Sequence, residues 1–136
     1  MIDKLEAKRV AGCSKLVALR HKITLNETVG IAKYRFFDGV RDNLEGTVSK
    51  KGGYLEADLS KVEVSFDRIV LSGYNLAGHT SLKVKVGEDF VTPDFAEVKE
   101  ENLSIIYLFK ETVSPEAIRF DFFGGENVEL YELEAF

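Results

Sequence analysis

The sequence contains no tryptophan, one cysteine, two histidines and two prolines in its 136 residues. The single cysteine, Cys13, cannot form an internal disulfide, which excludes an extracellular domain held together by disulfide bonds. We interpret Cys13 as a small buried apolar residue rather than as a nucleophile. His21, His79 and Cys13 show neither the His-x-x-x-His nor the Cys-x-x-Cys spacing of zinc sites.

Long apolar runs and blocks of like charge are also missing. No apolar run approaches the ~20 residues of a membrane span, and residues 1–8 lack the hydrophobic core of a signal peptide. The net charge is −5 and the charges are evenly mixed, whereas phosphate binding requires clustered Lys and Arg. We therefore predict no membrane span and no nucleic-acid partner, and expect an extracellular or virion-associated location.

Catalytic signatures are absent as well. There is no Gly-x-Ser-x-Gly elbow and no phosphate-binding glycine loop. Acidic residues are so plentiful that a carboxylate pair could be drawn almost anywhere, so no such pair is informative. We predict that the chain is not an enzyme.

The sequence does contain a clear period of two. In residues 54–59, Leu55, Ala57 and Leu59 share one face, and Val62 and Val64 continue this pattern into a second strand over 62–71. The phase breaks at residues 67–68, which predicts a bulge or a bend. Residues 72–75 are interpreted as the following turn.

The second half of the chain predicts further strands. Residues 81–86 alternate as a half-exposed strand, 103–109 form a nearly continuous apolar run typical of a strand buried on both faces, and 118–122 and 127–136 are the last two strands. About eight short strands separated by Gly and Pro turns predict an all-β antiparallel β-sandwich, a jelly roll, as a single domain over 1–136. Ten Phe and five Tyr provide the large side chains of its core.

The first 33 residues are the least defined part of this domain. Residues 16–19 and 23–25 are interpreted as two short strands, with 26–30 as a turn. A helix over residues 3–11 is an alternative for the beginning of the chain.

Several segments, in this order, resemble the galactose-binding-like domains, also called discoidin or coagulation factor type C domains. They are an Asp-Gly loop, a strand ending in Asp-Leu, a strand of the Ile-x-Leu kind, and two closing strands with a late glutamate: residues 37–39, 53–59, 66–71, 118–122 and 128–136. The likeness covers residues 34–136 and implies an eight-stranded jelly roll without catalysis of its own. Residues 71–78 are also similar to a loop of bacteriophage tail and fibre proteins.

The sequence departs from this family at two places. Residues 47–49, Thr-Val-Ser, follow the Asp-Gly loop where the family often has a tryptophan, and the terminal cysteine pair of the coagulation type is missing. These departures weaken a lipid-binding role of the coagulation kind. They leave a sugar-binding platform as an expectation.

The resemblance also implies a structural Ca²⁺ ion, which takes 6–8 oxygen ligands. The candidates implied by it are Asp38, Asp42, Thr47 and Glu132. Unbroken alternation would place Glu132 inward with Val128 and Leu130, where a carboxylate needs a partner. Alternatively, Glu132 pairs with Arg35, Arg41 or a backbone N–H, or a bulge turns it outward.

The candidate ligand-binding residues lie in two loops: Tyr74, Asn75 and His79 in one, Arg41 and Asn43 in the other. An aromatic face with amide, guanidinium and imidazole groups suits a sugar. In the alternative interpretation, Tyr74 packs on the edge of the sandwich and His79 is an ordinary exposed loop residue.

Two functions follow from these observations. The first is a non-catalytic carbohydrate-binding module whose partner is a glycan. The alternative is a structural or adhesion module of a larger assembly, such as a phage virion or tail component, whose partner is a host or structural protein. Whether the chain forms an oligomer is left open.

Overall fold

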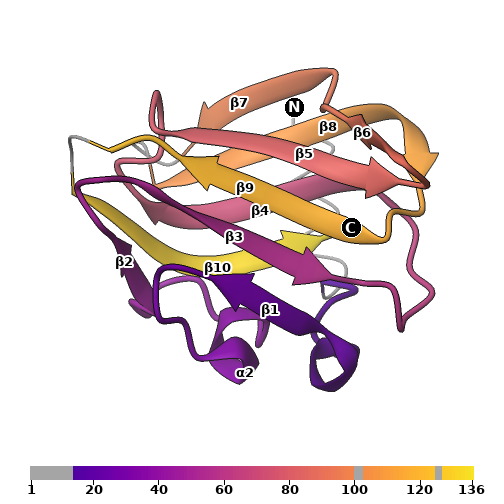
Figure 1. Ribbon diagram of the computed structural model, residues 1–136, viewed down its shortest axis with the longest axis horizontal. Coiled ribbons are helices and arrows are strands. Elements are labelled where there is room, and N and C mark those ends of the chain that lie inside the picture. Colours follow the sequence, from indigo (N-terminus) through magenta and orange to yellow (C-terminus); the bar gives the residue numbers. More distant parts are fainter. Residues whose placement is uncertain (1–13, 100–102, 125–126) are drawn as a thin grey trace, which may run out of the picture.

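The computed structural model describes residues 14–99, 103–124 and 127–136, which form a sandwich of two antiparallel five-stranded sheets (Figure 1). The first sheet contains, in spatial order, β1 (Thr24–Glu27), β3 (Gly53–Asp58), β9 (Ala117–Phe122), β5 (Thr80–Val86) and β6 (Asp89–Val91). The second contains β2 (Gly46–Val48), β10 (Val128–Ala135), β4 (Phe66–Tyr74), β8 (Ser104–Val113) and β7 (Phe95–Lys99). The predicted all-β sandwich is confirmed. The suggested helix over 3–11 and Cys13 lie outside the described residues.

The described residues form ten strands rather than about eight, because the short strands β2 and β6 extend the two sheets. The helical elements among them are η1 (Arg20–Lys22) and α2 (Lys33–Phe36). Neither is long and apolar enough to cross a membrane.

The core lies between the sheets and follows the predicted alternation. Leu55 of β3 and Phe120 of β9 face Ile69 and Leu71 of β4, and all four side chains are inaccessible to solvent. The rings of Tyr107 and Phe120 meet edge to face, with 6.0 Å between their centroids, and join the two sheets. Burying a side chain of this size stabilises a fold by roughly 1.5–3 kcal/mol.

The prediction of a strand over 16–19 is wrong. The backbone there bonds to itself, since the N–H of Val17 donates to the Ser14 carbonyl, that of Leu19 to Leu16, and that of Lys22 to Leu19. These local bonds occupy backbone groups that strand pairing would need, and the segment forms turns that lead into η1. The second predicted strand, over 23–25, corresponds to β1, which continues through Glu27 into the expected turn.

Strand β4 is shifted along the chain relative to its prediction. Val62 and Val64 pack on the core from a loop, and the strand begins at Phe66. The expected bulge is confirmed, because the register with β8 shifts between Phe66 and Arg68. The expected turn over 72–75 lies largely inside the strand. A Cβ at Gly73 would meet the Glu129 carbonyl oxygen of β10 at 2.1 Å, so this glycine permits close packing and does not form a turn.

The remaining strands agree with their predictions. The apolar run of 103–109 corresponds to β8, in which Ile105 and Tyr107 face the core while Ile106 packs with Val70 on the outer face. β8 lies between β4 and β7 and is buried on both faces there, as predicted. β5, β9 and β10 coincide with the other three predicted strands.

Candidate functional site

A bulge in β10 decides which way the late glutamate faces. The register between β10 and β4 shifts between Leu130 and Glu132, and Glu132 lies opposite Ser72. Because Leu71 points into the core, Ser72 and Glu132 point to the outer face of the second sheet. The inward position expected from unbroken alternation is therefore wrong, and the alternative with a bulge is the one found.

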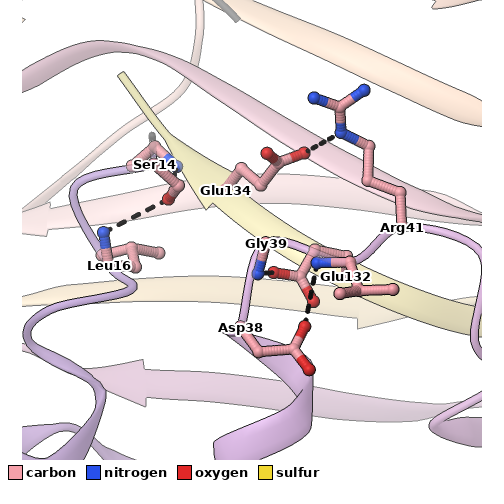
Figure 2. Close-up of polar contacts among 9 residues, drawn as sticks. Ser14, Leu16, Asp38, Gly39, Arg41, Glu132 and Glu134 are labelled. Carbon is pink, nitrogen blue, oxygen red and sulfur yellow. Dashed lines mark hydrogen bonds and ion pairs between the residues drawn. The ribbon is translucent and has the colours of Figure 1, made fainter. Parts of the chain in front are cut away.

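Glu132 is nevertheless fully buried, because the loop that follows α2 lies against it (Figure 2). Gly39 has a φ of 88°, a conformation that favours glycine, and its N–H donates to the Glu132 Oε2 at 2.5 Å. Among the described residues no group bonds to the Oε1 atom. Burial, helped by the nearby Asp38 and Glu134 carboxyl groups, raises the pKa of Glu132 to about 9. The metal-free protein thus holds a proton on Glu132 at neutral pH.

The arginines considered as partners of Glu132 bind other carboxylates. The Arg41 Nε donates to the Oε1 of Glu134, which is also buried, at 2.8 Å (Figure 2). Arg35 pairs with Glu45 at 3.1 Å. Of the partners suggested for Glu132, the one found is a backbone N–H, that of Gly39.

The structure brings together two of the four residues suggested for calcium. The Asp38 carboxyl group lies close enough to Glu132 to raise its pKa and also accepts the Val40 N–H at 2.9 Å. Asp42 is exposed, and Thr47 lies in β2 opposite Glu129. Within the described ranges, no three His, Cys, Asp or Glu side chains form a group that could hold a metal. Asp38 and the unpartnered Glu132 oxygen fit a hard cation, whereas Asp42 and Thr47 do not join them.

The loop after α2 also borders a cavity of about 550 Å³, called here the outer cavity. It is lined by residues 39–42 together with Ser72, Leu103 and Tyr131. It therefore contains Arg41 of the predicted ligand residues. Asn43 is exposed in the same loop but does not line the cavity.

The other predicted ligand loop forms a second feature, called here the His79 edge: Asn75, His79, Phe123 and Asn127. The Asn75 side-chain amide donates to the Asn127 carbonyl at 3.2 Å, and Asn75 adopts a positive φ of 61°. The Phe123 N–H donates to the His79 carbonyl at 2.9 Å, and the His79 Nδ1 lies 3.2 Å from the Phe123 carbonyl. These bonds tie the loop after β4 to the loop after β9.

Tyr74, the last residue of β4, is half exposed, so its side chain is not buried against the edge of the sandwich. It lies opposite Glu129 in the register of β10. Its side chain points to the outer face, as Ser72 does, so the predicted ligand residues divide between two places.

Sequence reasoning missed Phe123, whose side chain is 54% exposed. A signal was present, because Phe123 directly follows Phe122 in an alternating strand, so that one of the two must face away from the core. It also missed Ser72, Leu103 and Tyr131 in the outer cavity. The predicted turn at 72–75 concealed Ser72, and Tyr131 lies at the bulge in β10 that the sequence offered only as an alternative.

No protein-family model and no curated protein sequence matches the chain. Solved structures do. A family 32 carbohydrate-binding module from Clostridium perfringens NanJ, in complex with galactose, has a TM-score of 0.62 at 12% identity, covering 85% of this chain and 94% of that one. The family 32 module of Streptococcus pneumoniae EndoD has a TM-score of 0.61 at 10% identity, covering 84% and 94%.

A chitosan-binding module of a Paenibacillus chitosanase/glucanase has a TM-score of 0.60 at 15% identity, covering 83% of this chain and 93% of that one. Each comparison spans both sheets of the sandwich, since it covers more than four fifths of either chain. The chain therefore has the galactose-binding-like fold of the family 32 carbohydrate-binding modules.

Proposed function

We propose that the chain is a non-catalytic carbohydrate-binding module that binds a glycan at the His79 edge. The observation that carries this proposal is the exposed Phe123, whose backbone N–H and carbonyl both contact His79. The similar structures support it, because they are carbohydrate-binding modules. One of them is solved in complex with galactose, and another is a chitosan-binding module.

The chemistry of the His79 edge suits a sugar. An aromatic ring packs on the C–H face of a pyranose, while His79 and Asn75 offer hydrogen bonds to hydroxyl groups. The loops come from a rigid sandwich, which lowers the entropic cost of binding. Binding at so shallow a site is expected to be weak, with a Kd of ~μM to mM. A glycan partner is in keeping with the extracellular location expected from the sequence.

A glycan array followed by calorimetric titration tests this function. Phe123→Ala is expected to weaken binding by tenfold or more, because loss of a stacked ring removes about 1.5 kcal/mol or more. Phe95→Ala is the matched control, since Phe95 is also 54% exposed but lies on β7. A glycan that the Phe123→Ala and His79→Ala proteins bind as tightly and with the same stoichiometry as the wild type would contradict the proposal, as would silence across the array.

We further propose that Asp38 and Glu132 bind Ca²⁺. The cation would supply positive charge that holds both carboxylates in their ionised form, and so would fix the loop after α2 against β10. The unpartnered Glu132 Oε1 supports this proposal. The ion has a structural role here and takes part in no reaction.

A second candidate is a structural or adhesion module, favoured by apolar side chains on the outermost strands β6 and β7. Phe90, Val91, Phe95 and Val98 are all more than a third exposed there. Exposed apolar patches often mark protein contacts. A strict monomer in light scattering at all concentrations would count against this candidate. The similar structures named above give no support to a phage-tail role.

A further inference from the structure

We propose that the outer cavity is a second ligand site of this chain, which accepts an uncharged pyranose ring. Its volume of about 550 Å³ lies within the ~300–1,000 Å³ typical of small-molecule sites. None of the four residues of the His79 edge lines it. The proposal deepens the carbohydrate-binding function and rests on it for the class of ligand.

An unsatisfied hydroxyl lies in the wall of the cavity. Ser72 is 2% exposed, and its Oγ has no hydrogen-bond partner in the described part of the chain. Ser104 lies directly opposite it on β8 and carries a second buried hydroxyl of the same kind. A buried polar group without a partner is destabilising, so its presence needs an explanation. A ligand hydroxyl in the cavity would satisfy Ser72 once this side chain turns toward the cavity, because its Oγ is inaccessible to solvent in the ligand-free protein.

Arg41 and Asp42 add a donor and an acceptor at the loop side of the cavity. The Arg41 Nε is bonded to Glu134, and Figure 2 shows the two terminal nitrogens of the guanidinium pointing away from that carboxylate. These nitrogens can only donate, whereas the exposed Asp42 carboxylate can only accept. Adjacent hydroxyls of a sugar ring can accept from one and donate to the other.

Tyr131 provides an aromatic wall with a fixed orientation. Its hydroxyl donates to the Glu129 Oε1 at 2.8 Å, which holds the ring in place. Because this polar tip already has a partner, the ring face remains for the C–H groups of a pyranose. Leu103, at 40% exposure, adds apolar surface on another side.

The charges of the cavity favour an uncharged ligand. Glu134 already balances the positive charge of Arg41, and Asp42 would repel the carboxylate of a uronic acid. The ammonium group of an amino sugar would lie beside the Arg41 guanidinium. A neutral ring uses every hydrogen-bonding group named here without adding a charge.

Backbone NMR titration of the whole chain tests the proposal with defined probes. Methyl β-galactopyranoside and methyl β-glucopyranoside, each raised to about 50 mM to cover millimolar Kd values, are compared with glucosamine and galacturonate. The neutral glycosides are expected to shift the amide signals of Gly39, Asp42 and Leu103. The charged sugars are expected to bind there at least about fivefold more weakly.

Variants separate the outer cavity from the His79 edge. Ser72→Ala and Asp42→Ala should each weaken binding at the cavity signals by about fivefold, the loss of one hydrogen bond. Glu88→Gln, which changes an exposed residue on the β5–β6 turn, should leave binding at the cavity unchanged. Phe123→Ala should abolish shifts at Asn75 and His79 while those of the cavity remain.

Each outcome bears on one proposal. Shifts at the His79 edge alone would overturn the second site and leave the carbohydrate-binding function standing. Cavity shifts that Ser72→Ala and Asp42→Ala do not reduce would also overturn it, as would preference for galacturonate or glucosamine. Silence at both places with every neutral glycoside would contradict the function itself.

Discussion

At the residue scale, Glu132 combines full burial with an oxygen that no described group satisfies. Its pKa is about 9 in the folded protein, mainly because of burial, whereas a glutamate in an unfolded chain has a pKa of about 4.3. Between these values the folded state binds one more proton than the unfolded chain. The stability that Glu132 contributes by binding this proton is fully present below its pKa in the unfolded chain. It is lost as the pH rises through its pKa in the folded protein.

We predict that the metal-free protein loses stability as the pH rises from about 5 to about 9, by up to about 1.4 kcal/mol per pH unit. Glu132→Gln should remove most of this slope, because the amide still accepts the Gly39 N–H but does not titrate. Thermal melts in EDTA across this range measure it. Glu88→Gln should retain the slope, and a Glu132→Gln protein that keeps the wild-type slope would refute the assignment.

Two buried serines differ in their partners and so in their expected effect on stability. The Oγ of Ser14 accepts the N–H groups of Leu16 and Ala135 at 3.2 and 3.0 Å, whereas the Oγ of Ser104 has no partner in the described structure. Ser14→Ala should cost about 1–3 kcal/mol, because it leaves two buried donors unpaired.

Ser104→Ala should be neutral or stabilise the protein by about 1 kcal/mol, since it removes a hydroxyl that is desolvated without compensation. Urea denaturation of both variants measures the difference. Equal losses in the two variants would show that Ser104 does make a hydrogen bond in solution.

At the element scale, the contact between β4 and β10 depends on Gly73. A Cβ there would meet the Glu129 carbonyl oxygen at 2.1 Å, and backbone cannot move aside as a side chain can. Gly73→Ala should therefore destabilise the protein by about 1–3 kcal/mol, the usual range for overpacking. Gly53→Ala is the control, because its Cβ would meet the Thr28 Oγ1, the end of a rotatable side chain.

Denaturant unfolding compares the two glycine variants. The smaller loss is expected for Gly53→Ala. A Gly73→Ala protein as stable as the wild type would mean that the two strands separate without cost.

The sequence predicted elements well where alternation was uninterrupted and poorly where packing decided the local structure. β3, β5, β9 and β10 followed their patterns because one face of each lies in the core. Residues 16–19 looked like a strand, since a short apolar run does not show whether its backbone bonds to a sheet or to itself. Gly73 looked like a turn, since composition does not reveal a close approach of another strand.

The same limit applies to the site. The Asp-Gly loop and the late glutamate were identified, and the structure places Asp38 and Glu132 together. The direction of Glu132 depends on a bulge that only the register with β4 reveals. The outer cavity joins residues from four distant segments, so no local pattern could predict it.

At the scale of the whole molecule, the loop after α2 and β10 connect residues that lie far apart in the chain. Gly39 bonds to Glu132 and Arg41 to Glu134, so the early loop is held against the closing strand of the sandwich (Figure 2). Closing so long a loop costs conformational entropy, and a cation that binds only the folded state would offset part of that cost.

Calcium should therefore raise the melting temperature of the entire domain and not only order one loop. We expect the free energy of unfolding to rise by about 2.7 kcal/mol at a Ca²⁺ concentration one hundred times the Kd. Calorimetric melts with and without Ca²⁺ measure this, and Asp38→Asn and Glu132→Gln should each reduce the rise, whereas Thr47→Ala should not. If Ca²⁺ leaves the melting temperature of the wild type unchanged at pH 8, Glu132 is held neutral by its proton alone. If Thr47→Ala removes the rise, the ion binds at β2 and not at the Asp38–Glu132 pair.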